Sequence, residues 1–463
     1  MLFRSKRKQF KLLQLEAKQL IPLAAPILAA QLAQQTLAFT DTVMAGRVSA
    51  TDLAGVAVGG SIWGPIFLFI YGVLLAITPI VAQLHGAGKT AETGPLARKG
   101  IVVAVPLVFI AILLLQNAGL IFLWMDVDPQ IATISTAYLK AISWGMPALA
   151  LFFLLRNLSE GMGLVRPSML IGLASIPVNI AGNYVFIYGK LGFPAMGGIG
   201  CGWASALSLW FMCGCMLLTI WRVRRYDRTH FFDLNKTCGA EGAPQLLRLG
   251  LPIGLALLVE SSIFALIALF LSPLGALTVA SHQITLNYSS MIFMIPLSLA
   301  TAITIRVGHA IGQQRFDRAR LSSRTGLLLN TAIALVTATL TLIFAERIAG
   351  IYTQNQQVIV IAVGLLYLNA LYQVSDAFQI GAAAALRGYK DSRIPLLMVI
   401  IAYWVIGLPL GYSLALTDFW GTPLGAEGFW ISLIIGLTIA ALLLGIRLYR
   451  VSRKETPLLQ IDK

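Results

Sequence analysis

Three acidic residues interrupt long apolar stretches of this chain, where a carboxylate is costly. Asp41 lies in LAAQLAQQTLAFTDTVMAG, Glu260 in LALLVESSIFALIALFL and Asp376 in LYQVSDAFQIGAAAA. An ionised Asp at the centre of a membrane helix costs about 2.5–3.5 kcal/mol on insertion scales. A cavity, a basic partner or a bound cation must offset that cost, so these acids predict a cation-binding or proton-binding function.

Amide and hydroxyl residues occur at helical spacing in other apolar stretches. Asn179 and Asn183 are four residues apart, and so are Tyr372 and Asp376, so each pair shares one face of a helix. The two amide oxygens could complete a Na⁺ site with a carboxylate, or the amides could hydrogen-bond a protonated Asp41. Each pair could equally form an ordinary contact between helices. Further polar residues that could line a substrate cavity are Ser261, His282, Gln283 and Asn287.

Fixed positive partners for these acids are not expected, because almost every Lys and Arg lies outside the apolar stretches. A carboxyl group that is removed from water favours its protonated form, and an approaching cation displaces the proton. Such a group can exchange a proton for Na⁺, or either of them for a cationic substrate. This exchange is the minimal chemistry of an antiporter.

The composition indicates a membrane protein. Of 463 residues, 58% are hydrophobic and 11% are charged, whereas a soluble chain has about 25% charged residues. The formal net charge of +15 would suggest a nucleic-acid partner in a soluble protein. Basic loops on one side of a membrane produce the same charge, so no nucleic-acid partner is expected.

Twelve apolar stretches are long enough to cross a membrane as helices, which takes about 20 residues each. The predicted spans are 20–45, 53–80, 100–125, 132–155, 167–189, 199–221, 250–271, 279–304, 323–345, 357–385, 395–416 and 426–446. An even number of spans places both termini on one side. If that side is the cytoplasm, 30 of the 34 Lys and Arg residues lie there, as the positive-inside rule requires.

The two halves of the sequence resemble each other. Matching pairs are Leu53/Leu277, Leu75/Leu299, Ala76/Ala300, His85/His309 and Gly88/Gly312 at a separation of 224, Pro26/Pro252 at 226, and Gly161/Gly388 and Arg166/Arg393 at 227. We therefore predict an all-α polytopic membrane protein with two six-helix lobes related by a pseudo-twofold axis along the membrane normal. The expected bounds are 1–221 for the N-lobe, 222–248 for a cytoplasmic linker and 249–463 for the C-lobe.

The acids do not follow this repeat. Glu260 aligns with Gln34, and Asp41 aligns with Ile267. The scaffold is thus expected to be duplicated while the chemistry is not. Another short motif, HGAGKT from His85 to Thr90, resembles the end of a phosphate-binding loop, but Gln83 stands where that loop needs glycine. No nucleotide chemistry is expected, so the energy must come from an ion gradient and no cofactor is predicted.

Four short motifs occur in order across the twelve spans, namely DTVMAG from Asp41, GAGK after the second span, EGMGLVRPSM after the fourth and LRGYKDSRIP after the tenth. Together they resemble the multidrug and toxic compound extrusion (MATE) transporters, in particular their bacterial NorM-like branch. The resemblance covers essentially the whole chain. It implies a two-lobed exporter of the bacterial inner membrane that extrudes cationic, amphipathic compounds, such as fluoroquinolones, ethidium-type dyes and aminoglycosides, in exchange for Na⁺ or H⁺.

The resemblance also implies two groups of coupling residues. The N-lobe group is Asp41, Asn179 and Asn183, and the C-lobe group is Glu260, Tyr372 and Asp376; either group could hold Na⁺. Other branches of the family carry an Asp where this chain has Asn183, a departure that favours the NorM-like branch.

The prediction is therefore a monomeric antiporter, not an enzyme, that binds cationic drugs and dyes within the lipid membrane and works by alternating access. Pro26, Pro177 and Pro252 lie inside spans and are candidate kinks. A flippase for lipid-linked sugars is the nearest alternative, but it would need basic residues in its cavity. An intramembrane enzyme would need a nucleophile with a base or a metal cluster, and a channel would need a filter motif.

Overall fold

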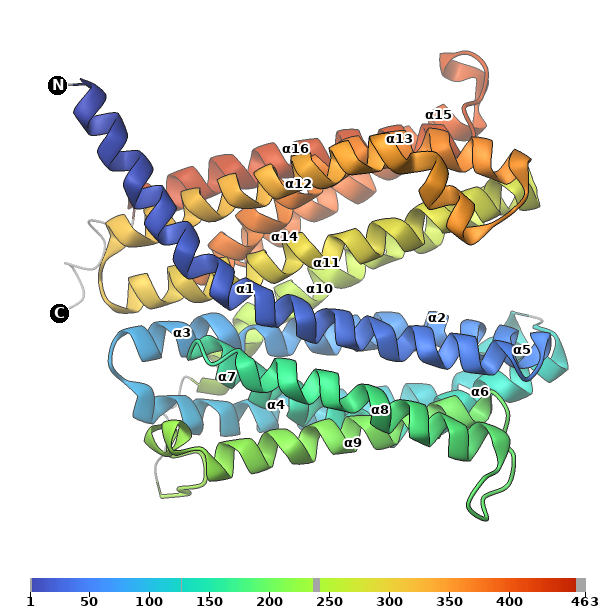
Figure 1. Cartoon of the computed structure of the whole chain (residues 1–463), viewed down its shortest axis with the longest axis horizontal. Helices are drawn as coiled ribbons and strands as arrows, with labels where there is room; N and C mark the ends of the chain where they lie inside the picture. The colour runs from blue at the N-terminus through green and yellow to red at the C-terminus, as the bar shows by residue number, and fades with distance from the viewer. Residues whose placement is uncertain (1, 126, 236–241, 455–463) are drawn as a thin grey trace. The chain divides into compact units, whose positions relative to one another are not determined.

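The computed structural model describes residues 2–125, 127–235 and 242–454, and those with regular structure are helical (Figure 1). In chain order the α-helices are α1 (Leu2–Gly46), α2 (Ala50–Leu75), α3 (Ile77–Gly86), α4 (Thr93–Gln116), α5 (Ala118–Trp124), α6 (Pro129–Ser143), α7 (Met146–Gly161), α8 (Arg166–Tyr188), α9 (Ile199–Arg222), α10 (Gly242–Leu271), α11 (Ala276–Gly312), α12 (Phe316–Tyr352), α13 (Gln356–Gly388), α14 (Arg393–Ile400), α15 (Leu408–Leu416) and α16 (Ala426–Lys454). The shorter helices are η1 (Thr90–Glu92), η2 (Arg224–Thr229), η3 (Ser272–Leu274), η4 (Ile401–Gly407) and η5 (Asp418–Trp420).

The described part of the chain contains 11 helical segments that are long and apolar enough to cross a membrane, and counting the bent pair α6–α7 as one span gives 12. The prediction of an all-α polytopic membrane protein is thus confirmed. The predicted span at 132–155 is this pair, which bends by 49°. Pro147 lies in the first turn of α7 and has no N–H to continue the ladder from α6, which accounts for the break.

The chain divides into two compact units, which we call the N-lobe (Ala29–Gly254) and the C-lobe (Met1–Leu28 with Leu255–Lys463). Two helices therefore change unit along their length. In α1 the change comes after Leu28, and in α10 it comes after Gly254. These bounds differ from the lobes expected at 1–221 and 249–463. The expected linker at 222–248 contains η2 and the first residues of α10, and its residues 236–241 lie outside the described part of the chain.

Packing explains why the first part of each helix belongs to the other unit. In α1, Leu20 is fully buried in a C-lobe cluster that includes Leu299 and Ile303. In α10, Leu246 and Ile253 belong to the N-lobe core. At Gly250, a Cβ atom would lie 2.4 Å from the carbonyl oxygen of Val73, so only glycine permits this approach.

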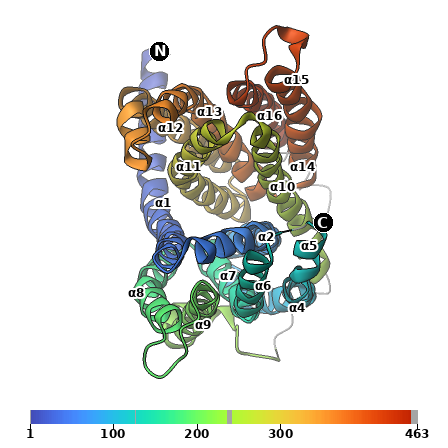
Figure 2. The same cartoon turned by 90° about the vertical axis from the view of Figure 1, so that its right-hand side faces the viewer.

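Each lobe has its own helical core. In the N-lobe, α2 packs on α6 and α7, while α9 packs on α6, α7 and α8 (Figure 2). In the C-lobe, α13 packs on α11, α12 and α16. Small residues allow the close approaches, as membrane helices require in the absence of a hydrophobic driving force between them.

The predicted repeat is present, but its register differs in the first spans. The turns after α3 and α11 have left-handed residues at Gly88 (φ +76°) and Gln314 (φ +58°), which are 226 residues apart. The helices α2 and α11 also begin 226 apart, at Ala50 and Ala276. The predicted pairs at a separation of 224, from Leu53/Leu277 to Gly88/Gly312, are therefore wrong by two residues. They rested on identical residue types, whereas the backbone turn shows which positions are equivalent.

The pair Gly161/Gly388 is confirmed as structurally equivalent. A Cβ atom on Gly161 would lie 2.8 Å from Cβ of Val81, and one on Gly388 would lie 2.8 Å from Cβ of Val307. Val81 and Val307 are again 226 apart. The same helix contact is therefore built once within each lobe.

Candidate functional site

Asp41 lies in the last turns of α1 and is 6% exposed. Its Oδ1 accepts hydrogen bonds from Nδ2 of Asn183 at 2.6 Å and from Nδ2 of Asn179 at 3.1 Å. Both asparagines lie on α8 and are fully buried. The structure thus brings the three predicted N-lobe residues into direct contact.

Ser205 on α9 completes this group and was not predicted. Its hydroxyl donates to Oδ2 of Asp41 at 2.6 Å, so both carboxylate oxygens accept hydrogen bonds from neutral side chains. Among the described residues, Oδ1 of Asn183 is a buried oxygen with no hydrogen-bond donor. A carboxylate beside an unused amide oxygen offers two oxygen ligands of the kind that a hard cation prefers.

Glu260 on α10 is partly buried, and its Oε1 accepts a hydrogen bond from Nε2 of Gln379 on α13 at 2.9 Å. Arg387, near the end of α13, interacts electrostatically with Glu260. The expectation that the acids lack a basic partner is therefore wrong for Glu260. Arg387 was placed in a loop because it ends an apolar stretch, but α13 continues to Gly388.

Asp376 and Tyr372 lie on the same face of α13, as predicted, and are 8% and 6% exposed. Glu260 interacts electrostatically with both of them. Tyr372 also hydrogen-bonds Tyr403. Asp376 faces a small cavity that it lines with Gln373, Ser289 and Pro296 among others. The C-lobe thus places two acids and two phenols in one cluster.

The four residues suggested for a substrate cavity differ in burial. His282 is fully buried, and its Nδ1 accepts a hydrogen bond from the indole of Trp430 at 3.3 Å, so it differs from the expectation of a cavity-lining residue. Ser261 donates to a carbonyl of its own helix. Gln283 and Asn287 are exposed one turn apart on α11.

Comparisons with known proteins identify the family. The MatE family model matches residues 26–185 and 252–413. The chain belongs to the MatE family. The "Multidrug resistance protein NorM" of Photobacterium profundum is 46% identical over 433 residues, which cover 94% of this chain and 95% of that protein. The "Multidrug resistance protein MdtK" of Edwardsiella ictaluri is 44% identical, with 95% and 96% covered.

Solved structures share the fold of this MatE chain. The eukaryotic MATE transporter AtDTX14 has a TM-score of 0.85 at 20% identity and covers 96% of this chain and 98% of its own. A MATE structure in the straight conformation also has a TM-score of 0.85, at 19% identity, with 95% and 97% covered. The predicted resemblance to NorM-like MATE transporters is confirmed, and the chain is a transporter rather than an enzyme.

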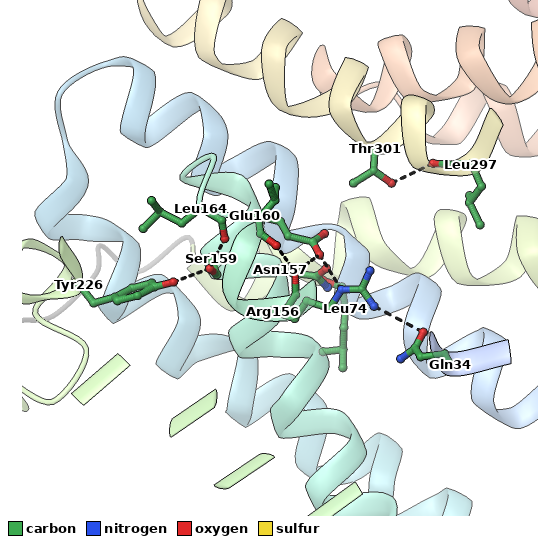
Figure 3. A network of polar contacts seen from close by, with 12 residues as sticks. Gln34, Leu74, Arg156, Asn157, Ser159, Glu160, Leu164, Tyr226, Leu297 and Thr301 are labelled. Atoms are coloured by element: carbon green, nitrogen blue, oxygen red, sulfur yellow. Dashed lines mark hydrogen bonds and ion pairs between the residues drawn. The ribbon is translucent and has the colours of Figure 1, made fainter. Parts of the chain in front are cut away.

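A buried charge network of this MatE chain escaped the sequence-based prediction. Nε of Arg156 donates to Oε1 of Glu160 at 2.6 Å, and Nη1 reaches Oε1 of Gln34 at 3.5 Å (Figure 3). Arg156 and Glu160 are 3% and 2% exposed. Arg156 was expected in a cytoplasmic loop, but it lies inside α7. The spacing of four residues was the available signal, because it places opposite charges on one helix face.

The sequence gives only a weak signal for Ser205 and Gln379 as partners of the acids. Ser205 follows Cys201 by one turn, and the Cys201 thiol donates to the Asp41 backbone carbonyl at 3.5 Å. Small polar residues are common in membrane helices, so this spacing does not identify a partner. Which helix faces Asp41 is decided by the packing of α9 against α8.

Proposed function

We propose that this MatE transporter exports cationic, amphipathic drugs and dyes and takes up Na⁺ or H⁺ in exchange. Its NorM and MdtK relatives are named multidrug resistance proteins, and this name supports a drug substrate. A cationic substrate suits the anionic residues of both lobes. We expect no cofactor beyond the coupling ion.

The observation that carries the proposal is the environment of Asp41. Its carboxylate is removed from water but, within the described part of the chain, accepts side-chain hydrogen bonds only from the neutral groups of Asn179, Asn183 and Ser205. A buried charge needs compensation, and neutral donors supply only part of it. A bound proton or a cation supplies the remainder, and its exchange is the coupling step.

The C-lobe cluster is proposed as a second coupling site. Glu260 and Asp376 interact electrostatically, and two neighbouring carboxyls do not both ionise easily. A cation or proton that enters relieves the repulsion, and a cationic drug has the same effect. Ion and drug occupancy are therefore expected to exclude one another, although Arg387 already offsets part of the charge of Glu260.

Alternating access is proposed to use the two helices that change unit. Pro26 in α1 and Pro252 in α10 each lie two residues before the change. Each proline removes a backbone hydrogen bond and lowers the cost of bending. We place both termini in the cytoplasm, since 30 of 34 basic residues then lie inside. We also propose that the chain acts as a monomer in the bacterial inner membrane.

The test is transport of an ethidium-like dye by proteoliposomes that contain the purified chain, under an imposed Na⁺ gradient or an imposed pH gradient. The variants are Asp41→Asn, Glu260→Gln and Asp376→Asn, which keep the side-chain shape and remove the charge. We expect each to lower gradient-driven transport by about tenfold or more, as the loss of roughly 1.4 kcal/mol or more of coupling implies.

Glu346→Gln is the matched control, because Glu346 is an exposed acid on α12 and its loss changes the net charge equally. It should transport like the wild type. Wild-type rates in all three carboxylate variants, at equal reconstitution, would exclude the proposal. A response to only one of the two gradients identifies the coupling ion.

A further inference from the structure

A groove of about 1080 Å³ opens on the C-lobe between α1, α12, α13 and α16. One end of it is basic, with Arg318, Arg320 and Arg324 from α12 and Arg453 from α16. Apolar residues line the remainder, namely Leu12, Leu13, Leu327, Leu328, Phe378, Leu442 and Ile446. The groove therefore has a charged head and a hydrophobic body.

The placement of these residues suits the edge of a membrane. Leu328 and Leu442 are each 61% exposed on helices that are long and apolar enough to cross the bilayer. The arginines lie near the start of α12 and the end of α16, where these spans leave the apolar region. An occupant must therefore be anionic at one end and hydrocarbon at the other.

The equivalent place in the N-lobe is covered by the chain itself. Gly100 and Gly326 pack against Ile77 and Ile303, each pair 226 apart, so Arg98 is the equivalent of Arg324. Nη1 of Arg98 donates to the backbone carbonyls of His230 and Phe231 at 3.0 and 2.7 Å. The segment after α9 thus supplies the oxygens that this arginine needs.

That covering segment is firmly packed on the N-lobe. A Cβ atom on Gly94 would lie 2.3 Å from the carbonyl oxygen of Thr229, and Tyr226 is buried and hydrogen-bonds Ser159 (Figure 3). Burial raises the pKa of Tyr226 above its ordinary value, so its hydroxyl stays neutral. In the C-lobe, Arg320 stands at the position equivalent to Gly94, so the close backbone approach that Gly94 allows cannot be repeated there.

We propose that this C-lobe groove binds one anionic phospholipid. The phosphate is held by Arg318 and Arg324, since guanidinium groups recognise phosphate by paired hydrogen bonds. The acyl chains lie along Leu328, Leu442 and Ile446. Basic pockets between membrane helices are suited to anionic head groups.

Two neighbouring contacts give the site its shape. Nε of Arg320 donates to the carbonyl of Ser452 at 2.6 Å, which joins α12 to the end of α16. The guanidinium of Arg453 lies 4.3 Å from the ring centre of Tyr449. Asp317 also lines the groove, but its side chain is 99% exposed and lies 3.5 Å from Arg320. Such an exposed ion pair is weak, so the head-group region keeps its positive charge.

The test is native mass spectrometry of the purified full chain with dioleoyl phosphatidylglycerol and, separately, dioleoyl phosphatidylethanolamine. The variant is Arg318→Gln with Arg324→Gln, which leaves Arg320 and its contact to Ser452 in place. We expect one phosphatidylglycerol to bind the wild type, weak binding of phosphatidylethanolamine, and about tenfold weaker phosphatidylglycerol binding to the variant.

The matched control is Lys140→Gln with Arg347→Gln, which removes two exposed charges outside the groove and should leave lipid binding unchanged. Thermal unfolding of both variants shows whether they are folded. Equal lipid binding by the two variants overturns the proposal. Competition by deacylated glycerophosphoglycerol would show that the site binds phosphate without acyl chains. Stronger lipid binding after removal of residues 455–463 would show that this segment is the natural occupant of the groove. Either result overturns the proposal.

Discussion

The two lobes share a scaffold but hold their acids in different ways. In the N-lobe, Asp41 receives hydrogen bonds from three neutral side chains. In the C-lobe, Glu260 receives a hydrogen bond from Gln379 and interacts electrostatically with Asp376 and Arg387. The N-lobe acid is surrounded by neutral dipoles, whereas Glu260 in the C-lobe lies near both a second acid and a basic residue.

The basic residues of the lobes reinforce this contrast. In the N-lobe, Arg156 forms an ion pair with Glu160 one helical turn away. Gln34, which contacts Arg156, occupies the position equivalent to Glu260 of the C-lobe. In the C-lobe, Arg387 occupies the position that the repeat gives to Glu160. Duplication thus preserved the helix contacts, while the charges were redistributed. A site can change its chemistry without change to the packing that supports it.

The largest expected effect is on the N-lobe charge pair. Arg156→Met leaves Glu160 buried without its partner and should destabilise the protein by about 3–5 kcal/mol. Unfolding in detergent, followed by circular dichroism, measures this loss. The double variant Arg156→Met with Glu160→Leu removes both charges and should recover most of the stability. A single variant as stable as the wild type would contradict the structural role of the pair.

The next effect tests whether the scaffold is truly duplicated. Gly161→Ala and Gly388→Ala each place a Cβ atom 2.8 Å from a valine Cβ, and each should cost about 1–3 kcal/mol, because the backbone must shift. The same unfolding measurement applies. Equivalent sites should lose similar amounts, so a large effect in only one lobe would break the comparison.

Two other glycines give the control for that pair. A Cβ atom at Gly214 in α9 or at Gly350 in α12 meets nothing within 4 Å. Gly→Ala there should be neutral or stabilise the helix by about 0.5–1 kcal/mol. Destabilisation at these positions as well would indicate a general intolerance of alanine rather than a specific helix contact.

The smallest effect concerns the hydrogen bonds to Asp41. Ser205→Ala removes one donor and should cost about 1 kcal/mol, together with a shift in the concentration of coupling ion that gives half-maximal dye transport. Ser208→Ala on the same helix removes only a bond to the carbonyl of Ala204 and should leave that concentration unchanged. An equal response to both variants would show that Ser205 does not act through Asp41.

The spans were predictable because hydrophobic length alone defines a membrane helix. Their limits were not, since a helix extends beyond the membrane when other residues bury its ends. Glu16 shows this: it lies before the predicted first span, yet its carboxylate accepts hydrogen bonds from Arg306 and Ser322 at 2.6–2.9 Å. These contacts of the buried Glu16 hold the start of α1 in the C-lobe.

The acids of the site were predictable one by one, because each stands out against an apolar background. Their partners were not equally visible. Asn179 and Asn183 share a helix and show their spacing, whereas Ser205 and Gln379 reach Asp41 and Glu260 from other helices. Contacts between helices depend on rotation about each helix axis, which a single sequence constrains poorly.

By itself, the sequence determined the membrane class, the helical spans, the repeat and the identity of the acids, because hydropathy and helical spacing are local properties. Tertiary structure alone decided which groups balance each acid, that Arg156 and Arg387 belong to helices rather than loops, and that α1 and α10 change unit. These features depend on which faces meet across the bundle. The energy of a buried charge is set by its neighbours in space. The same carboxylate can therefore be paired with a basic residue, repelled by a second acid or available to bind an ion.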